Sequence, residues 1–320
     1  MSLVIPYAKI KSLIATVDVI SAMEKAFIQY SNGNSVVPPV GELVFEDPPG
    51  DVHIKYGYIK GDEYYVIKIA SGFYENYALG IPSGQGLMLV FKQMTGQLEA
   101  ILLDNGLLTD IRTAATGALA AKYFRPKESS SVGIIGTGMQ ARQQLKYLQL
   151  VAPSEKVWLW GRNPERVKAL SSELKSKFEI HVADSPAELA SQTRLIISTT
   201  ASRQPVLSKE DIQVGTTIIA IGSDTQEKQE LDPLILQRAD KVISDSLPQS
   251  ENRGEIFKAI SSGDLDRNKV VELGMAIQHR NLQRVDESEI IVVDLTGVAV
   301  QDIMISSEVL SKYNQSHCAS

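Results

Sequence analysis

A glycine-rich segment in the middle of the chain, SVGIIGTGMQA at 131–141, constrains the fold most strongly. A short apolar run leads directly into Gly136 and Gly138, and a helical pattern follows. This strand–turn–helix order is the context in which G-x-G-x-x-A binds a dinucleotide, because glycines permit the turn and the close approach of a pyrophosphate. The N–H groups at the start of the helix would face the anion. We therefore expect a dinucleotide-binding domain to begin near 131, the alternative being an ordinary glycine turn.

Composition and charge exclude several classes of protein. The chain has 320 residues and a formal net charge of −6, and its scattered lysines and arginines argue against non-specific nucleic-acid binding. No stretch approaches the roughly 18 apolar residues of a membrane span, and the N-terminus lacks the pattern of a signal peptide. The only cysteine is Cys318, and the four histidines are dispersed, so we expect neither a disulfide nor a metal site. These features indicate a cytoplasmic enzyme.

The first 125 residues and the remainder show different hydrophobic periods. A helical pattern at 17–30 is followed by segments with a period of two at 36–45, 51–59, 64–74 and 86–103, which predict an antiparallel sheet. An alanine-rich helix is expected at 109–123. From 131 onwards strands alternate with helices, which predicts a doubly wound parallel sheet covered on both faces. The expected strands are 131–135, 156–160, 179–183, 194–199, 216–221, 241–244 and 289–294, and the expected helices are 164–177, 185–191 and 254–262.

A final helix at about 298–313 could return to the first domain, which would then be discontinuous. The predicted fold class is α/β. A Rossmann domain at 123–298 is joined to an α+β substrate-binding and dimerisation domain formed from both chain ends, 1–122 and 299–320.

Several segments together resemble the ornithine cyclodeaminase/μ-crystallin family. They are VIKIASGFYEN, LLTDIRTAATGALAAKY, IIGTGMQAR, IGSDTQEKQELDP and DLTGVAVQDI, and they follow one another in the family's order over nearly the whole chain. The resemblance implies a homodimer. It also implies hydride transfer between a nicotinamide cofactor and the α-carbon of an amino or imino acid. The family includes ornithine cyclodeaminases, alanine dehydrogenases, ketimine or Δ1-pyrroline-2-carboxylate reductases, and crystallins that bind NADPH and thyroid hormone.

The resemblance assigns roles to three charged residues. Arg112 would hold the substrate carboxylate, which suits the bidentate geometry of a guanidinium; an ion pair with Asp104 or Asp110 is the alternative. Lys68 lies in an apolar strand and would contact the substrate and assist proton transfer, unless it faces solvent. Asp224 follows an expected strand and would bind the substrate amine or handle its proton, although a helix or turn cap would use the same carboxylate.

The cofactor preference depends on the end of the strand 156–160. An NAD site usually has an acidic residue there, whereas this chain offers Arg162, which could accept a 2′-phosphate. We expect NADPH to be preferred, with NADH as the alternative if Arg162 is merely exposed. Ser83 is expected near the substrate. The expected cofactor-binding residues are Thr113, Gly136, Thr137, Gly138, Met139, Gln140, Arg162, Asn163, Thr199, Thr200, Ser223, Asp294, Thr296 and Gly297.

Two departures from the family bear on the substrate. Gly41 stands at the apparent position of a second carboxylate-binding arginine, and Lys55 follows His53 where ornithine cyclodeaminases have an acidic residue and a methionine. Lys55 would repel a cationic ornithine side chain but could bind an anion, unless it lies on the strand surface. We therefore expect a reductase of a small cyclic α-imino acid. Ornithine cyclodeaminase, an amino-acid dehydrogenase or acyclic iminosuccinate reductase, and a non-catalytic crystallin-like NADPH-binding protein are the alternatives.

Overall fold

The computed structural model describes residues 2–73 and 75–318, so residue 74 of the expected strand 64–74 and residues 1 and 319–320 of the expected first domain lie outside it. The chain divides into two compact units. Unit 1 contains the residues up to Arg112 and those from Val298 onward, and unit 2 contains Thr113–Gly297. The division falls within helix α3 (Leu107–Phe124), which corresponds to the helix expected at 109–123. The domain boundaries expected at 122 and 299 stay a prediction about independently folding domains.

Unit 1 is built on a seven-stranded sheet in the order β1-β7-β6-β5-β4-β2, with β3 also paired to β4. Its strands are β1 (Leu3–Pro6), β2 (Ser35–Val36), β3 (Gly41–Phe45), β4 (Gly50–Ile59), β5 (Tyr64–Phe73), β6 (Gly84–Lys92) and β7 (Leu98–Leu103). Apart from the parallel pair of β1 and β7, neighbours are antiparallel, as expected. The segment expected as one strand at 36–45 forms two, because Pro38 and Pro39 between them lack the N–H that a ladder needs.

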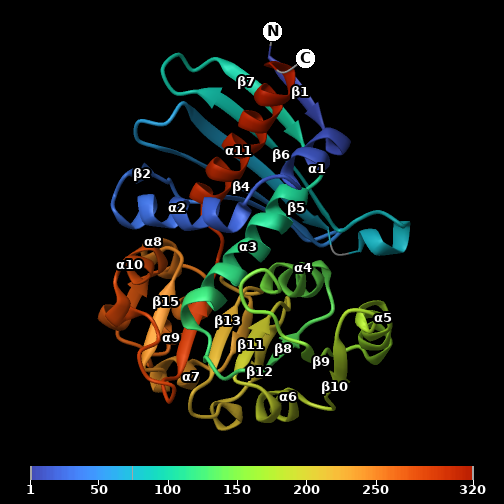
Figure 1. The fold of residues 1–320 in the computed structure, drawn as a ribbon, viewed down its shortest axis with the longest axis vertical. Helices are drawn as coiled ribbons and strands as arrows, with labels where there is room; N and C mark the ends of the chain where they lie inside the picture. The colour runs from blue at the N-terminus through green and yellow to red at the C-terminus, as the bar shows by residue number, and fades with distance from the viewer. Residues whose placement is uncertain (1, 74, 319–320) are drawn as a thin grey trace. The chain divides into compact units, whose positions relative to one another are not determined.

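Helices cover one face of this sheet. They are α1 (Tyr7–Ile14), α2 (Val19–Ser31) and α11 (Ala299–Cys318), and α11 packs against α2, β4 and β5 (Figure 1). The side chains beneath them alternate along the strands, so Lys68, Met88 and Leu102 lie in register on the covered face. The expected return of the last helix to the N-terminal sheet is therefore confirmed. The strand β1 and the helix α1 were not expected.

Unit 2 contains an eight-stranded, wholly parallel sheet in the order β10-β9-β8-β11-β13-β17-β15-β16. Its strands are β8 (Ser131–Ile135), β9 (Lys156–Trp160), β10 (Glu179–Val182), β11 (Leu195–Ser198), β13 (Thr217–Ala220), β15 (Lys241–Ser244), β16 (Val270–Glu272) and β17 (Ile291–Asp294). All seven strands expected after 131 are present, and β16 was not expected. The predicted Rossmann-type fold is confirmed.

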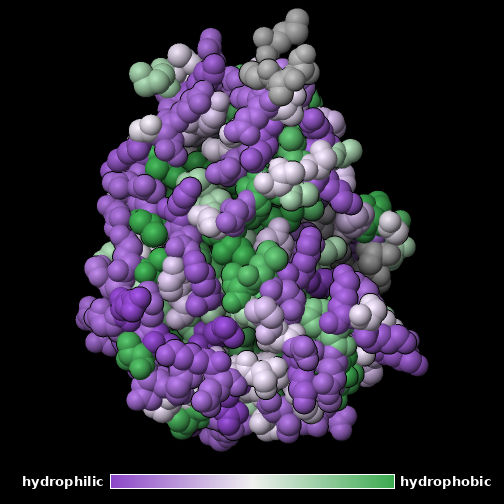
Figure 2. Space-filling model, viewed as in Figure 1, coloured by the Kyte–Doolittle hydropathy of each residue, from purple (hydrophilic) through white to green (hydrophobic). Residues whose placement is uncertain are grey.

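The helices of unit 2 connect and cover these strands (Figure 1). They are α4 (Met139–Leu148), α5 (Pro164–Leu174), α6 (Pro186–Gln192), α7 (Pro233–Arg238), α8 (Leu247–Ser250), α9 (Gly254–Ser261) and α10 (Leu273–Gln278), with a two-stranded sheet of β12 (Arg203–Leu207) and β14 (Gln229–Leu231) beside them. Several begin with a capping side chain followed by proline, as at Ser185 and Asp232. The face shown in Figure 2 is mostly hydrophilic, as expected for amphipathic helices that bury their apolar side.

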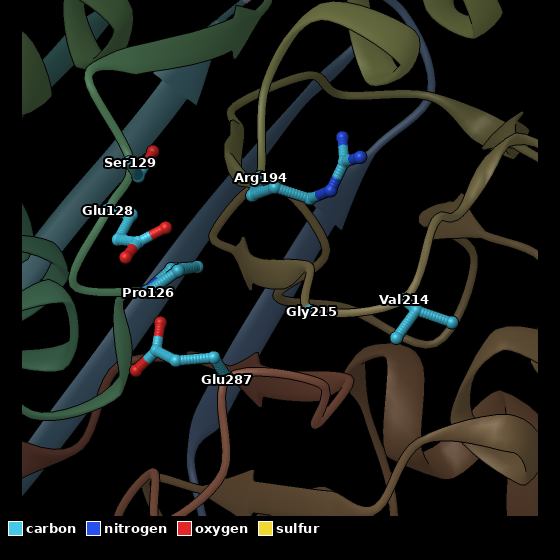
Figure 3. A pocket seen from close by; sticks show the side chains of 7 residues that line it. All are labelled: Pro126, Glu128, Ser129, Arg194, Val214, Gly215 and Glu287. Carbon is cyan, nitrogen blue, oxygen red and sulfur yellow. The ribbon is translucent and has the colours of Figure 1, made fainter.

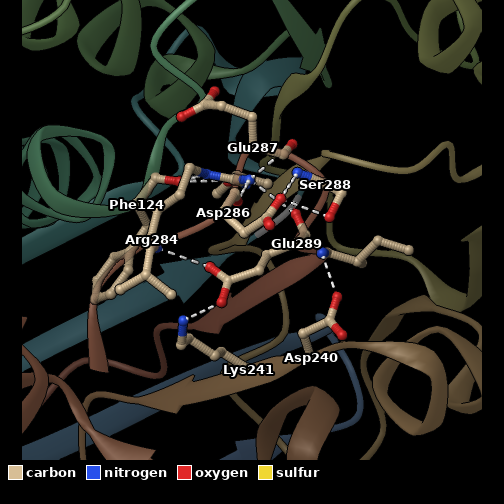
Figure 4. Close-up of polar contacts among 11 residues, drawn as sticks. Phe124, Asp240, Lys241, Arg284, Asp286, Glu287, Ser288 and Glu289 are labelled. Atoms are coloured by element: carbon tan, nitrogen blue, oxygen red, sulfur yellow. Dashed lines mark hydrogen bonds and ion pairs between the residues drawn. The ribbon is translucent and has the colours of Figure 1, made fainter. Parts of the chain in front are cut away.

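An arginine fixes the end of α3 to the amino ends of the unit 2 strands. The guanidinium of Arg284 donates to the carbonyl of Phe124 at 2.9 Å, to Thr217 Oγ1 at 2.7 Å and to the carbonyl of Glu289 at 2.9 Å (Figure 4). Lys241 and Glu289 form an ion pair beside it. This network lies at the edge of the sheet opposite the glycine turn, because every residue in it precedes or begins a strand or ends α3.

Candidate functional site

A buried ionic cluster lies on the helix-covered face of the unit 1 sheet. Lys68 on β5 and Lys55 on β4 are cross-strand partners, and both are at most 5% exposed. Lys68 Nζ lies 2.9 Å from Asp302 Oδ2 on α11, and Arg112 Nε on α3 lies 3.2 Å from Asp302 Oδ1. Two of the predicted substrate residues therefore meet at one carboxylate. The surface-lysine alternatives for Lys55 and Lys68 are excluded by their burial.

Gln301 holds Arg112 from a second direction. Arg112 Nη1 donates to Gln301 Oε1 at 2.9 Å, and the same oxygen accepts the backbone N–H of Val298 at 2.7 Å. Sequence reasoning did not single out Gln301 or Asp302. The signal was present, since a polar pair interrupts an apolar run at 298–303 in a helix expected to be buried.

The electrostatics of the cluster favour an anion. Burial and the nearby Arg112 lower the pKa of Lys68 to about 8. Burial alone would raise the pKa of Asp302, but Lys68, Arg112 and Lys55 lower it. Three buried cations, Lys55, Lys68 and Arg112, thus gather around the carboxylate of Asp302, and burial raises the pKa of the nearby Asp104. Buried cations are costly unless anions compensate them.

The glycine turn of unit 2 has the geometry of a dinucleotide cradle. Gly136 has φ +119°, and a Cβ there would lie 2.5 Å from Thr199 Oγ1. Gly138 precedes α4 without a side-chain cap, and a Cβ built on it meets nothing within 4 Å. The backbone around Thr137 is fixed by Arg142, whose Nη1 donates to the carbonyls of Thr137 and Gly138 at 2.9 and 3.0 Å. The open approach and uncapped N–H groups fit a pyrophosphate.

The other candidates for cofactor and substrate binding differ in their exposure and in their hydrogen bonds. Arg162 follows β9 and is exposed, whereas the Asn163 side chain accepts the N–H of Arg166 at 3.1 Å and so caps α5. Met139 is exposed at the start of α4. Gln140 Oε1 and the carbonyl of Thr113 both accept from the amide of Gln144, at 3.3 and 3.2 Å. In unit 1, Ser83 is half-buried, and its carbonyl accepts the N–H of Phe73 at 2.9 Å.

The remaining candidates follow the carboxyl ends of β11, β13 and β17. Thr199 Oγ1 donates to the carbonyl of Ile135 at 3.1 Å, and Thr200 N donates to Glu230. Ser223 Oγ donates to the carbonyl of Lys228 at 2.8 Å, and Asp224 Oδ1 lies 2.6 Å from Lys228 Nζ. In doubly wound folds, ligands bind at this edge of the sheet.

Asp294, Thr296 and Gly297 at the end of β17 make internal contacts. Asp294 is fully buried, and its Oδ2 accepts the N–H of Ile256 at the start of α9 at 2.9 Å. Asp245 accepts from Thr296 Oγ1 at 3.0 Å and from the N–H of Gly297 at 2.6 Å. Burial and the neighbouring Glu255 raise the pKa of Asp294 well above its usual value. These contacts give Asp294 a structural role. The sequence had left a structural role and a cofactor contact equally open.

A cavity of about 280 Å³ lies at the opposite edge of the unit 2 sheet (Figure 3). It is lined by Pro126, Glu128, Ser129, Arg194, Val214, Gly215 and Glu287. These residues precede strands and include none of the predicted site residues. The described residues contain no group of three or more His, Cys, Asp or Glu side chains placed to hold a metal ion. Within the same residues, no helix has the length and apolarity needed to cross a membrane.

Comparison with known proteins assigns the chain to a family. The family model "Ornithine cyclodeaminase/mu-crystallin family" matches residues 2–317. The chain belongs to this family. An uncharacterized cyclodeaminase, y4tK, of Sinorhizobium fredii is 39% identical over 91% of this chain and 89% of its own length. An iminosuccinate reductase of Paracoccus denitrificans is 34% identical over 75% of each chain.

Two solved structures of family members superpose on nearly the whole chain. The Δ1-pyrroline-2-carboxylate reductase of Thermococcus litoralis, in complex with NADH and L-proline, is 27% identical and gives a TM-score of 0.91 over 98% of both chains. An archaeal alanine dehydrogenase dimer with bound NAD is 32% identical and gives a TM-score of 0.89 over 99% of this chain and 97% of the other. The relatives thus act on amino or imino acids, with different substrates.

Proposed function

We propose that this protein is an NAD(P)H-dependent reductase of a small cyclic α-imino acid, of the Δ1-pyrroline-2-carboxylate type, that forms an L-proline-type amino acid. The observation that carries the proposal is the buried cluster of three cations, Lys68, Lys55 and Arg112, around Asp302. A carboxylate would neutralise it, and the guanidinium would bind that carboxylate in a bidentate manner. The similarity to the Thermococcus litoralis reductase supports this substrate class.

Each charged residue has one proposed task. Arg112 and Lys55 orient the carboxylate, and Asp302 with Gln301 holds the guanidinium in place. Lys68, whose pKa is lowered to about 8, polarises the imine nitrogen and supplies its proton. Asp224 handles the proton or the amine of the product, in exchange with its ion pair to Lys228.

The residues of the glycine turn fit a nicotinamide dinucleotide. Gly136 and Gly138 would bind its pyrophosphate, and Thr199 and Thr200 follow the neighbouring strand end. When bound in reduced form, the nicotinamide supplies the hydride for the imine carbon. NADPH is the proposed preference, because Arg162 is exposed after β9 and no acidic residue stands directly at the end of that strand. The named structures contain NADH and NAD, which supports NADH as the alternative.

One observation bears on the cyclodeaminase alternative. Lys55 is buried beside Lys68, and Glu42, the neighbouring carboxylate on β3, forms an ion pair with His53 at 2.9 Å. A second cation in the substrate would meet this positive charge, so ornithine is a poorer substrate than a neutral or anionic imino acid. Acyclic imines such as iminosuccinate, which carry a further carboxylate, remain the second candidate.

A direct assay tests the proposed function. The protein is supplied with Δ1-pyrroline-2-carboxylate and NADPH or NADH, with iminosuccinate in a parallel reaction, and with ornithine and NAD⁺. Formation of proline with oxidation of the reduced cofactor is the expected result. Ammonia and proline from ornithine without net cofactor change would instead identify a cyclodeaminase. Tight NADPH binding with no turnover of any imine would identify a crystallin-like binding protein.

The homodimer is proposed from the face of the unit 1 sheet that the helices leave uncovered. Tyr56, Ile67, Leu89 and Ile101 are register partners across four strands on this face, and Tyr56 is 38% exposed. A continuous apolar sheet face of this kind usually marks an interface. The archaeal alanine dehydrogenase is a dimer, which supports a second copy as the occupant. Sedimentation of wild type and Ile67→Lys, expected to be dimer and monomer, tests this; a monomeric wild type would contradict it.

A further inference from the structure

A buried carboxylate that has no task in the proposed function connects two strand-end turns of unit 2. Glu230 on β14 is fully buried. Its Oε2 accepts from Ser198 Oγ at 2.9 Å and from the N–H of Gly222 at 2.8 Å, while its Oε1 accepts the N–H of Thr200 at 2.5 Å. One side chain therefore satisfies donors from the ends of both β11 and β13.

These two turns carry residues that the proposed function uses. Thr199 and Thr200 follow β11, and Asp224 follows β13. These strands lie on the other side of β8 from β9, in the half of a doubly wound sheet that binds the nicotinamide end of a dinucleotide. The turns touch directly, because a Cβ on Gly222 would lie 1.9 Å from the carbonyl oxygen of Thr200. Displacing either turn would therefore displace the other.

Glu230 is itself held in place by a second buried carboxylate. Glu255, near the start of α9, accepts the N–H of Glu230 at 2.7 Å and that of Leu231 at 3.0 Å. The next residue of α9, Ile256, donates its N–H to Asp294 at the end of β17. Hydrogen bonds thus connect the ends of three neighbouring strands, β11, β13 and β17, through Glu230, Glu255 and Asp294.

The chemistry of this connection requires a carboxylate. An ionised carboxylate only accepts hydrogen bonds, so it matches two backbone N–H groups and a hydroxyl. A glutamine of the same size would turn an NH₂ group toward at least one of these donors. Burial is costly for a charge, and burial raises the pKa of Glu230 although the three donors oppose this rise. Such an arrangement is rigid when fully satisfied.

We infer that Glu230 is a positioning residue that fixes the turns after β11 and β13 for the nicotinamide end of the cofactor and for Asp224. The inference rests on the proposed function. It predicts that Glu230 affects the nicotinamide half of the cofactor and leaves the adenosine half, which the glycine turn would bind, unaffected.

The experiment compares two probes on wild type, Glu230→Gln and the control Glu227→Gln, whose parent side chain is exposed on the same segment. Calorimetry gives the affinity for NADPH and for 2′-phospho-ADP-ribose, which lacks the nicotinamide; NADH and ADP-ribose replace them if NADH is preferred. In wild type and the control, we expect NADPH to bind more tightly than the fragment. In Glu230→Gln, we expect the affinity for the fragment to be unchanged and the additional affinity that the nicotinamide gives NADPH to be lost. We expect kcat to fall about 100-fold.

A Glu230→Gln protein that retains the full gain from the nicotinamide would overturn the inference. If this variant does not fold, Ser198→Ala removes one of the three hydrogen bonds and should reduce the gain in the same direction; an unchanged gain in that variant would also overturn it. A wild-type protein that binds neither probe would overturn the proposed function, and the inference with it. If the wild-type protein binds both probes, a failure of the inference can be distinguished from a failure of the proposed function.

Discussion

Lys68 Nζ lies 2.9 Å from Asp302 Oδ2, although 234 residues separate them in the sequence. Asp302 also forms an ion pair with Arg112, so a single carboxylate on α11 fixes two cations, one from β5 and one from α3. The pair is fully buried, so each charge depends on the other for compensation. The position of Lys68, the proposed proton donor, therefore depends on the last helix, α11.

The pKa of Lys68 predicts the pH dependence of reduction. The pKa is lowered to about 8 by burial and Arg112, so the side chain is an ammonium below this pH and a neutral amine above it. If it supplies the imine proton, kcat/KM for the imino acid falls as the pH rises through about 8. Replacement by Met should lower kcat about 100- to 10,000-fold, whereas Lys92→Met, at a partly exposed position on β6, serves as control. A pH profile without a limb near 8 would contradict this role.

Asp302→Asn should destabilise the protein and change its response to acid. Removing one partner of a buried ion pair costs about 3–5 kcal/mol, because Lys68 and Arg112 lose their compensation. The pKa of Asp302 is lowered in the folded state, so its stabilisation is present above the unfolded-state pKa and is lost as the pH falls through the folded one. Urea unfolding of wild type and variant should therefore differ most at neutral pH and converge in acid. Glu308→Gln on the same helix should change little.

The two glycines of the turn should respond differently to alanine. At Gly136 the positive φ and the contact with Thr199 oppose a side chain, so Gly136→Ala should lower the melting temperature and the cofactor affinity together. At Gly138 φ is −81° and the space is open, so Gly138→Ala should keep the melting temperature but weaken cofactor binding. Thermal unfolding with and without NADPH measures both effects. Equal loss of stability in both variants would show that the turn is only structural.

Arg162→Ala tests the cofactor preference. If the exposed guanidinium binds the 2′-phosphate, the KM for NADPH should rise about tenfold, which corresponds to about 1.4 kcal/mol, while the KM for NADH stays constant. Arg166→Ala, an exposed arginine in the following helix, is the matched control. Unchanged use of NADPH would leave NADH as the natural cofactor.

Hydrophobic periodicity predicted most of the fold, because long buried strands repeat their pattern clearly. Val132, Ile134 and Ile135 are fully buried in β8, as their apolar run indicates. The strands β1 and β16 were not predicted, although four-residue strands such as β11 and β17 were.

The sequence proposed site residues only where a motif or a resemblance pointed to single positions. Lys68 and Arg112 were singled out in this way. Their partners Asp302 and Gln301 were not, because a polar residue within an apolar helix pattern does not indicate which side chain it meets. Glu230, on the short strand β14, was not singled out either. Its proposed role depends on three hydrogen-bond donors that come together only in the folded protein.

The placement of α11 also bears on the order of folding during synthesis. The ribosome synthesises β4, β5 and the start of α3 early. The helix α11, which covers their sheet and supplies the carboxylate for their cations, is made only after all of unit 2. Unit 2 can fold while it emerges, but the unit 1 sheet, whose strands are already made, lacks α11 and keeps its ammonium groups hydrated until then. Nascent chains stalled before 298 should therefore be cut by protease in the first hundred residues and protected in the later ones.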